Sequence, residues 1–484
     1  MRLGILTSHP IQYYSPWFRE LAKQVELEVF YAHQPDAAQQ GAGFGKSFSW
    51  DIDLLSGYQH RFLKNVSPSP GSDYYGGCDT PEIEDIISGK LNEASSRLDH
   101  LNRPAATFSP SDAEKESSRS GRGALNAQRS TLSTSTRFDA FIVVGWYLKT
   151  FRQAVRACRA AGIPVLVRGD SHLLTPRSWP KRLVMEVRQR WLLRQFDGFL
   201  SVGQRHTEYL RHFGVPARKI FSAPHFVDNE WFAAKAAEVR GQRSEIGNRK
   251  SEIRKRWGIP EEAFCVLFCG KFIPKKRPLD LVAAARILTS EIAKNTKDNS
   301  KRPVHLLLVG CGELGSQLRA NCHVVFDAES SSPLRLERVE GQGEVSNFPS
   351  APSSTINHQL PSASFAGFLN QSELPSAYVA ADVLVLPSES ETWGLTVNEA
   401  MACGLPAIVS DAVGCAPDLI EDGKTGFTYP IGNVAALAER LEQMAEMRWR
   451  NFDFSSEISK RLPAYGVETA VAGTLGAVSN LALP

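Results

Sequence analysis

Short apolar runs, each long enough for one buried strand, alternate with helix-like segments along most of this 484-residue chain. This alternation predicts parallel sheets covered by helices, because two parallel strands need a long crossover between them. The runs form two series, one in each half of the chain. The first is 3–7, 27–31, 140–144, 164–167 and 198–202, and the second is 264–269, 305–309, 364–366, 383–386 and 407–409. The sequence therefore predicts an α/β fold with two Rossmann-like domains.

Polar segments interrupt this alternation. Residues 94–136 and 327–362 are poor in apolar side chains, and residues 243–256 contain a near-repeat of Ser-Glu-Ile. Such compositions bury too little apolar surface to order a core, so we interpret them as surface insertions or linkers. We expect an N-terminal domain over 1–225, a linker over 226–260, a second domain over 261–440, and a helical segment over 441–484 that crosses back to the first domain.

Composition excludes several classes of protein. A net charge of +3 gives no reason to expect nucleic acid as a partner. The eight cysteines form no C-x-x-C pair or His/Cys cluster with zinc spacing, so neither a metal site nor a disulfide framework is expected. The chain lacks an apolar run of about 18 residues and starts with a strand rather than a signal peptide. We therefore expect a cytoplasmic location.

Two glutamates, Glu391 and Glu399, stand eight positions apart. Glu391 lies in a Pro-Ser-Glu-Ser-Glu loop after the run 383–386, and Glu399 lies in the helix that follows. Free N–H groups at the start of that helix favour a phosphate, and the two carboxylates can hold hydroxyls on either side of it. A ligand with hydroxyls on both sides of a diphosphate is a nucleotide sugar. Taken alone, the spacing is also typical of a solvated acidic loop and helix.

The block 381–426 resembles the signature of retaining glycosyltransferases of family 4, which have the two-domain GT-B architecture. It contains a strand, Pro-Ser, the E-x7-E helix, Gly-Leu-Pro, a second strand and Leu-Ile-Glu-Asp-Gly-Lys-Thr-Gly. The resemblance implies that Glu391 holds the transferred sugar beside its anomeric carbon and that Glu399 binds the ribose. It also implies donor contacts at Gly394, Leu395 and Thr396.

A basic cluster follows the first strand of the second series. Lys271 and Lys276 lie five apart in a loop at the carboxyl end of that strand, where ligands bind in open α/β sheets. Two ammonium groups can stabilise a diphosphate leaving group without a metal. The alternative is a solvated basic loop. The resemblance assigns both lysines to the leaving group, so we expect neither a metal nor a cofactor.

A literal G-x-G-x-x-G follows the run 305–309, with Gly310, Gly312 and Gly315. We do not interpret this pattern as a nicotinamide site. The next apolar run, at Val324, lies too near to Gly315 to leave room for a full crossover helix and its turns. The resemblance instead places Gly312 in a turn near the nucleotide. It places the nucleobase beside Phe368 and Leu369.

Acceptor-side residues are expected at two strand ends of the first domain. Asp170 and His172 follow one strand, and the resemblance implies that His172 contacts the donor sugar. The loop 8–16 follows another strand and lacks the glycines that the family often has there. We expect His9 and Gln12 in this loop to face the acceptor.

A basic amphipathic helix is expected over 176–196, where six Lys or Arg residues face a single acid, Glu186. Trp179, Leu183 and Val187 share one stripe at i, i+4 and i+8. Such a helix can lie on an anionic bilayer. The simpler interpretation, adopted from the sequence, is that the tryptophans pack on the protein's own sheet and the basic face is solvated.

The sequence thus predicts a retaining, metal-independent hexosyltransferase. The donor would be a UDP- or GDP-sugar and the acceptor a saccharide or a lipid-linked molecule, in polysaccharide or glycoconjugate synthesis. Peripheral contact with the inner membrane face remains open. The alternatives are a sugar-nucleotide epimerase or phosphorylase of the same fold, an NAD-dependent oxidoreductase, and a binding protein without catalysis.

Overall fold

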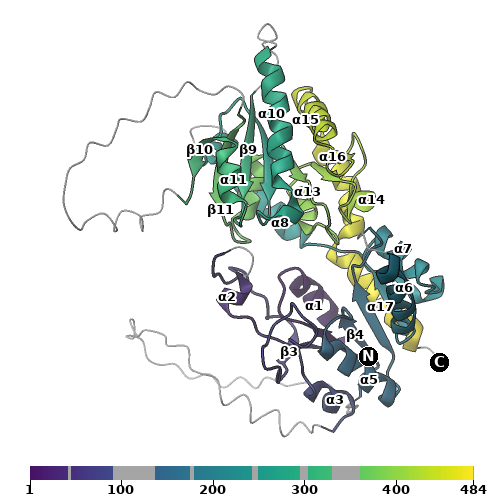
Figure 1. Cartoon of the computed structure of the whole chain (residues 1–484). Coiled ribbons are helices and arrows are strands. Elements are labelled where there is room, and N and C mark those ends of the chain that lie inside the picture. The colour runs from purple at the N-terminus through teal and green to yellow at the C-terminus, as the bar shows by residue number, and fades with distance from the viewer. Residues whose placement is uncertain are drawn as a thin grey trace, which may run out of the picture.

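The computed structural model describes residues 1–41, 45–90, 137–174, 179–241, 249–294, 303–329 and 360–482. Two seven-stranded parallel sheets, each covered by helices, form the two lobes of the molecule (Figure 1). The predicted α/β fold with two Rossmann-like domains is confirmed. The predicted insertion 94–136 and most of 327–362 lie outside the described residues.

The first sheet has the strand order β3-β2-β1-β4-β5-β6-β7. Side chains alternate between its faces, so Leu3 and Ile5 join one buried cluster while Leu6 joins another on the opposite face. The strands are β1 (Arg2–Thr7), β2 (Glu26–Tyr31), β3 (Gln59–Phe62), β4 (Ala140–Val144), β5 (Val165–Gly169), β6 (Gly198–Ser201) and β7 (Ile220–Ser222). The helices are α1 (Tyr14–Ala22), α2 (Ala37–Gln40), α3 (Glu82–Ile87), α5 (Lys149–Ala161), α6 (Trp179–Leu193) and α7 (Gln204–His212).

The second sheet has the order β10-β11-β9-β8-β12-β13-β14. Its central strands β8, β9 and β12 are buried along their whole length, as both faces carry helices. The strands are β8 (Phe264–Cys269), β9 (Val304–Val309), β10 (His323–Asp327), β11 (Ser362–Gly367), β12 (Val383–Leu386), β13 (Ala407–Ser410) and β14 (Gly426–Tyr429). The helices are α10 (Pro278–Lys294), α11 (Gly315–Ala320), α12 (Leu374–Ala380), α13 (Leu395–Ala402), α14 (Ala416–Leu419), α15 (Val434–Trp449) and α16 (Phe454–Arg461).

A helix follows the G-x-G-x-x-G turn, although the spacing predicted too little room for a full crossover helix. The six-residue helix α11 connects β9 to β10, so a short helix is enough for this crossover. β10 does not pair with β9 but with β11, which lies between them. The glycine pattern therefore starts a real, if short, strand–helix–strand unit.

The segment expected to be a polar linker contains two helices, α8 (Asn229–Gly241) and α9 (Arg249–Arg256). The second copy of the Ser-Glu-Ile repeat is thus helical. Its Arg254 is buried and pairs with Asp382 at 2.7 Å, and Lys250 pairs with the same carboxylate at 2.8 Å. Burial alone would raise the pKa of Asp382, but the two cations lower it to about 2. Ion pairs therefore hold this polar segment in place. The apolar content of the segment gives no sign of these ion pairs.

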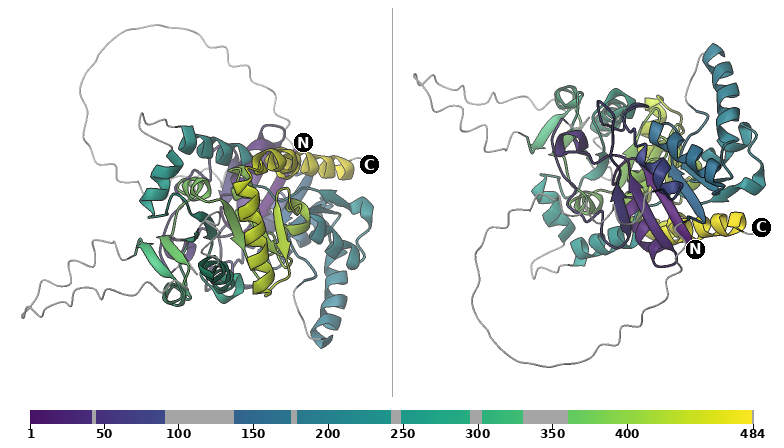
Figure 2. Two further views of the ribbon diagram at one scale, coloured as in Figure 1. Left: turned by 90° about the horizontal axis from the view of Figure 1, so that it is seen from above. Right: turned by 90° about the horizontal axis from the view of Figure 1, so that it is seen from below.

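The last helix, α17 (Val467–Ala482), returns to the first domain and lies beside its sheet (Figure 2). Val471 and Val478 are buried in the same cluster as Leu3 and Ile5. A Cβ atom at Gly473 would stand 1.8 Å from the carbonyl oxygen of Ser222, so the helix packs directly on the backbone of β7. The domain boundaries given above stay a prediction.

Candidate active site

The lysine loop and the E-x7-E loop meet at the carboxyl end of the second sheet. Glu391 follows β12, and its side chain is 20% exposed. Its carboxylate forms an ion pair with the ammonium group of Lys276. The Glu391 carbonyl also accepts a hydrogen bond from Gly414 N at 2.9 Å, which ties this loop to the end of β13. The structure thus brings together two side chains that are 115 residues apart in the chain.

Lys271 adds a second positive charge to this loop. Partial burial lowers the pKa of its ammonium group, and the neighbouring charge of Lys276 lowers it further. The two lysines are therefore close enough to repel each other. An anion placed between them would relieve that repulsion, so the loop suits a diphosphate.

Two glycines allow the close approach of backbone segments around this loop. Gly394 precedes the first residue of α13 and has φ 107°, a conformation that side chains with a Cβ rarely adopt. Leu395 and Thr396 are half-buried in the first turn of that helix. Gly312 has φ 151°, and a Cβ there would lie 2.7 Å from the carbonyl oxygen of Phe272. The turn after β9 thus lies against the loop that carries Lys271.

Glu399 is 1% exposed, and both of its oxygens accept hydrogen bonds. Tyr13 donates to one oxygen at 2.8 Å and Tyr378 to the other at 2.5 Å. Tyr13 immediately precedes α1 in the first domain, so this contact joins the two domains. Gln12 hydrogen-bonds Tyr13, which places Gln12 beside this cluster. Sequence spacing gave no signal for either tyrosine, because both reach Glu399 only through the fold.

The charge state of Glu399 makes stability depend on pH. Burial raises the pKa of Glu399 from 4.5 to about 7, although the two tyrosine hydroxyls partly oppose this rise. The folded state then keeps a proton that the unfolded state has lost. This contribution to stability is full below about pH 4.5 and disappears as the pH rises through about 7.

We therefore expect the melting temperature of the natural protein to fall relative to that of Glu399→Gln as the pH rises through about 7, because glutamine cannot ionise. Thermal unfolding of both proteins at a series of pH values between about 5 and 9 measures this difference. Parallel curves would show that Glu399 does not titrate in this range.

On the side of the first domain, His172 and Asp170 follow β5. His172 is 5% exposed, and its Nδ1 atom accepts a hydrogen bond from Leu174 N at 3.2 Å. Just before them, buried Arg168 donates to the carbonyl oxygens of Ala223 and Pro224 at 2.6 and 2.8 Å. These bonds fix the backbone from which His172 and Asp170 extend.

The loop after β1 carries His9, whose Nδ1 atom lies 3.0 Å from Ser8 Oγ. Burial and the nearby His33 lower the pKa of His9 to about 4, although Asp73 raises it slightly. His9 is therefore neutral near pH 7. Asp73 also raises the pKa of Lys271, so this carboxylate lies near both domains. Sequence reasoning missed Asp73, because nothing in its neighbourhood marks a site.

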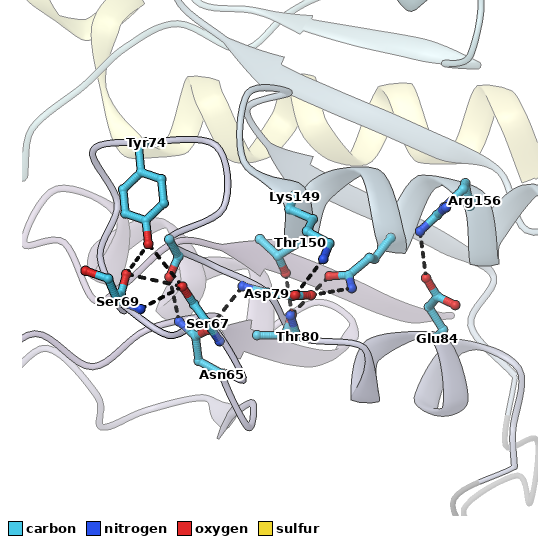
Figure 3. A network of polar contacts seen from close by, with 12 residues as sticks. Asn65, Ser67, Ser69, Tyr74, Asp79, Thr80, Glu84, Lys149, Thr150 and Arg156 are labelled. Carbon is cyan, nitrogen blue, oxygen red and sulfur yellow. Dashed lines mark hydrogen bonds and ion pairs between the residues drawn. The ribbon is translucent and has the colours of Figure 1, made fainter.

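A polar network fixes the loop that carries Asp73 (Figure 3). Asp79 accepts from Lys149 Nζ at 2.6 Å, and the hydroxyls of Thr80 and Thr150 lie 2.5 Å apart. At the other end of the loop, Tyr74 hydrogen-bonds Ser67 at 3.1 Å. The network ties the loop to α5, so Asp73 extends from a fixed support.

The loop predicted to line the nucleobase pocket touches the first domain. The ring of Phe368 packs on that of Phe48 with 4.4 Å between centroids, while the neighbouring Leu369 is buried. Asn370 Nδ2 donates to the carbonyl oxygen of Ser49 at 2.8 Å. Beside this contact lies a cavity of about 330 Å³ in the first domain, lined in part by Phe48, Trp50, Pro10 and Gln34.

Trp393, inside the E-x7-E loop, packs against the first domain. It is 3% exposed, and its ring lies 5.3 Å from that of His225 between centroids. Its Nε1 atom donates to Asn398 Oδ1 at 2.8 Å. A Cβ atom at Gly203 would stand 2.3 Å from a ring carbon of Trp393. The absence of a side chain at Gly203 therefore sets where the E-x7-E loop lies.

We expect Gly203→Ala to lower the free energy of unfolding by about 1–3 kcal/mol, the usual cost of overpacking, and to displace the E-x7-E loop. The backbone there is extended, so the effect is steric. Urea denaturation measures the loss. Gly71→Ala is the matched control, because Gly71 also lies outside helices and strands and no atom of a non-adjacent residue lies within 4 Å of its added Cβ. Equal stability of the two variants would show that Trp393 moves aside freely.

Family models match both halves of the chain. The model for "Glycosyl transferase 4-like domain" matches residues 80–224, and the model for "Glycosyl transferases group 1" matches residues 353–461. Together they cover more than half of the chain, one model in each domain. The chain belongs to the family 4-like glycosyltransferases. The resemblance inferred from the E-x7-E block is confirmed.

Curated relatives of this family are distant and match in part. The D-inositol 3-phosphate glycosyltransferase of Streptomyces bingchenggensis is 29% identical over 238 residues, which are 49% of this chain and 42% of that protein. The protein of the same name from Geodermatophilus obscurus is 28% identical over 354 residues, or 70% of this chain and 67% of that one. The chain spans about half the length of the first relatives that it matches.

Solved structures align with this chain over nearly its whole length. The structure of Anabaena Alr3699/HepE in complex with UDP and glucose aligns with a TM-score of 0.55 and 15% identity over 99% of both chains. A glycosyltransferase from Rickettsia africae aligns with a TM-score of 0.58 and 11% identity over 99% of this chain and 98% of that one. At these identities the likeness shows the fold, which is GT-B. Within the described ranges, no helix is long and apolar enough to span a bilayer.

Proposed function

We propose that this protein is a retaining glycosyltransferase that moves a sugar from a nucleoside-diphosphate sugar to an acceptor hydroxyl. The observation that carries this proposal is the meeting of Lys271, Lys276 and Glu391 beside the start of α13. A cationic pair next to free helix N–H groups suits a diphosphate. Glu391 then lies where the sugar attached to that diphosphate would extend. Family membership supports the same function.

In this proposal Lys271 and Lys276 stabilise the leaving diphosphate. The donor would take the place of the direct Lys276–Glu391 ion pair, so that the lysine contacts phosphate and the glutamate contacts sugar hydroxyls. N–H groups at Gly394, Leu395 and Thr396 would assist. Gly312 would lie near the nucleotide, and Phe368 and Leu369 would border the base.

Glu399 would bind the ribose hydroxyls. Because both of its oxygens already accept hydrogen bonds from tyrosines, a ribose reaches it only if one tyrosine moves. Tyr13 is the candidate, since it comes from the opposite domain and a small separation of the domains would withdraw it. Nucleotide binding would thus exchange a tyrosine hydroxyl for ribose hydroxyls at the same carboxylate.

The transfer would keep the anomeric configuration. The bond between the anomeric carbon and the phosphate oxygen breaks, and the acceptor oxygen bonds to the same face. The acceptor proton passes to the leaving phosphate. His172 would contact the donor sugar, while Asp170, His9 and Gln12 would form the acceptor side. No step in this scheme requires a metal.

The donor would be a UDP- or GDP-sugar, and the acceptor a saccharide or lipid-linked molecule in polysaccharide or glycoconjugate synthesis. The UDP named for the Anabaena structure supports the first of these nucleotides. Thermal-shift measurements with UDP, GDP and ADP sugars test the donor, because a ligand that binds only the folded state raises its stability.

An epimerase or phosphorylase of the same fold is the alternative function. Release of nucleoside diphosphate only in the presence of an acceptor would identify a transferase. Conversion of the donor without any acceptor would contradict our proposal and favour the epimerase.

A further inference from the structure

Helix α6 exposes an unusual number of large apolar side chains. In the described part of the chain, six of the fifteen exposed large apolar side chains lie between residues 173 and 191. Trp179 is 77% exposed, Val184 and Val187 are each 68% exposed, and Trp191 is 58% exposed. The sequence-based interpretation, in which the tryptophans pack on the first sheet, is therefore wrong. The side chain of Leu183 lies outside the described residues.

Another face of α6 covers the sheet instead. Gln189, Leu192 and Leu193 are buried there. Val184, Val187 and Trp191 are spaced i, i+3 and i+7, so they form one stripe on the side turned away from the sheet. We call this stripe the α6 apolar face. Trp179, the first residue of the helix, is exposed on a neighbouring side. The helix buries one side in the protein and presents a second apolar side to the surroundings.

Basic side chains border the α6 apolar face. At about 100° per residue, Arg188 lies on one edge of the stripe, and Arg194 directly follows the last residue of the helix. Both are exposed. The acid of this helix, Glu186, forms an ion pair with Arg190 at 2.7 Å, and its other oxygen lies 3.2 Å from Nε2 of His212. The exposed side of α6 is therefore apolar in the middle, with a cation at one edge and another at the C-terminal end of the helix.

The helix is also accessible to a large flat surface. Figure 2 shows α6 projecting away from the rest of the molecule in both views. Its projecting end carries Trp179, a residue type that prefers the boundary between water and lipid. A large surface could therefore approach the projecting end of α6 from outside the molecule.

We propose that the α6 apolar face is the docking surface for a lipid bilayer that carries negative charge. Apolar side chains would enter the boundary between headgroups and acyl chains, while the arginines contact anionic headgroups. Pairing with a second copy of this chain fits less well. Two such faces set against each other would bring arginine edges together without acidic partners.

Docking at the α6 apolar face would also bring a lipid-linked acceptor near the proposed active site. This one step rests on the proposed function. In sequence, His172 at the carboxyl end of β5 shortly precedes α6. A lipid-linked acceptor could then reach the acceptor side of the site from the bilayer to which α6 is bound. Membrane binding itself does not depend on any transferase activity.

The test is co-sedimentation of the full chain with vesicles of phosphatidylcholine alone and of phosphatidylcholine with phosphatidylglycerol. We expect sedimentation with the anionic vesicles at low salt, and less at high salt because charge attraction is screened within about 10 Å at 0.1 M. The double variant Val187→Ser, Trp191→Ser should bind at least about tenfold more weakly, through lost apolar burial. Val66→Ser is the matched control, since Val66 is 49% exposed on another part of the surface.

Three results would overturn this inference. They are no sedimentation with anionic vesicles at low salt, equal sedimentation of the double variant and the natural protein, and self-association in solution that the double variant abolishes. A thermal shift with nucleotide sugar should be unchanged in the double variant. Failure of docking and failure of the proposed function are therefore seen in separate measurements.

Discussion

Replacing Lys276 with Ala is expected to lower turnover by about 10²–10³-fold, because the leaving diphosphate would lose a charge that stabilises it in the transition state. Lys271→Ala should have an effect of similar size. Steady-state rates with the best donor from the thermal-shift series measure both. Lys275→Ala is the matched control, since this neighbouring lysine is exposed. Its backbone carbonyl oxygen accepts a hydrogen bond from Glu389 N, and alanine keeps that carbonyl.

The same series tests whether the lysines act in place of a metal. EDTA should leave the rate of the natural protein almost unchanged. A complete loss of activity in EDTA that Mg²⁺ or Mn²⁺ restores would contradict the proposed role of the lysine pair. A Lys275→Ala variant as slow as Lys276→Ala would show that only the overall charge of the loop matters.

Substitutions of the two glutamates are expected to impair different properties of the enzyme, nucleotide binding in one case and turnover in the other. Above about pH 7, where Glu399 is ionised, Glu399→Gln should weaken binding of free nucleoside diphosphate by roughly 10–100-fold, because a hydrogen bond to a charged group contributes about 1.5–3 kcal/mol. Glu391→Gln should leave that affinity nearly unchanged and instead lower turnover, since its proposed contact is the transferred sugar. Calorimetry with the nucleotide and initial rates with the donor separate the two effects.

Tyr13→Phe provides the matched control for this comparison. It removes one hydroxyl from Glu399 while keeping the ring, so nucleotide affinity should rise if the ribose competes with that hydroxyl. Equal loss of affinity in both glutamate variants would refute the division of roles. A loss of affinity in Tyr13→Phe would instead mean that Tyr13 helps to hold the nucleotide.

Much of the fold follows from the sequence, because buried parallel strands leave continuous apolar runs. β4, β8 and β12 have the predicted bounds, and the other predicted strands shift by one or two residues at an end. The strands not predicted, β3, β7, β10 and β14, are the edge strands of the two sheets. Such strands are less fully buried, so their sequences carry less of the apolar signal.

Local motifs also predicted the family and the residues around which the site is proposed. E-x7-E, the lysine pair and the glycine turns can be recognised from the sequence because each lies within one loop or the first turns of one helix. Such local structures are formed by consecutive residues. These features needed no knowledge of the partner domain. That is why a single block, 381–426, was enough to indicate the family.

Contacts between distant segments were decided by tertiary structure alone. Tyr13 reaches Glu399 across 386 residues, and Gly203 accommodates Trp393 across the domain boundary. In α6 the sequence determined a basic amphipathic helix with an apolar stripe. Only packing decided which side is buried, because Gln189, Leu192 and Leu193 face the sheet and leave both tryptophans exposed. Periodicity fixes which residues share a face of a helix, whereas the neighbouring elements fix which face meets the core.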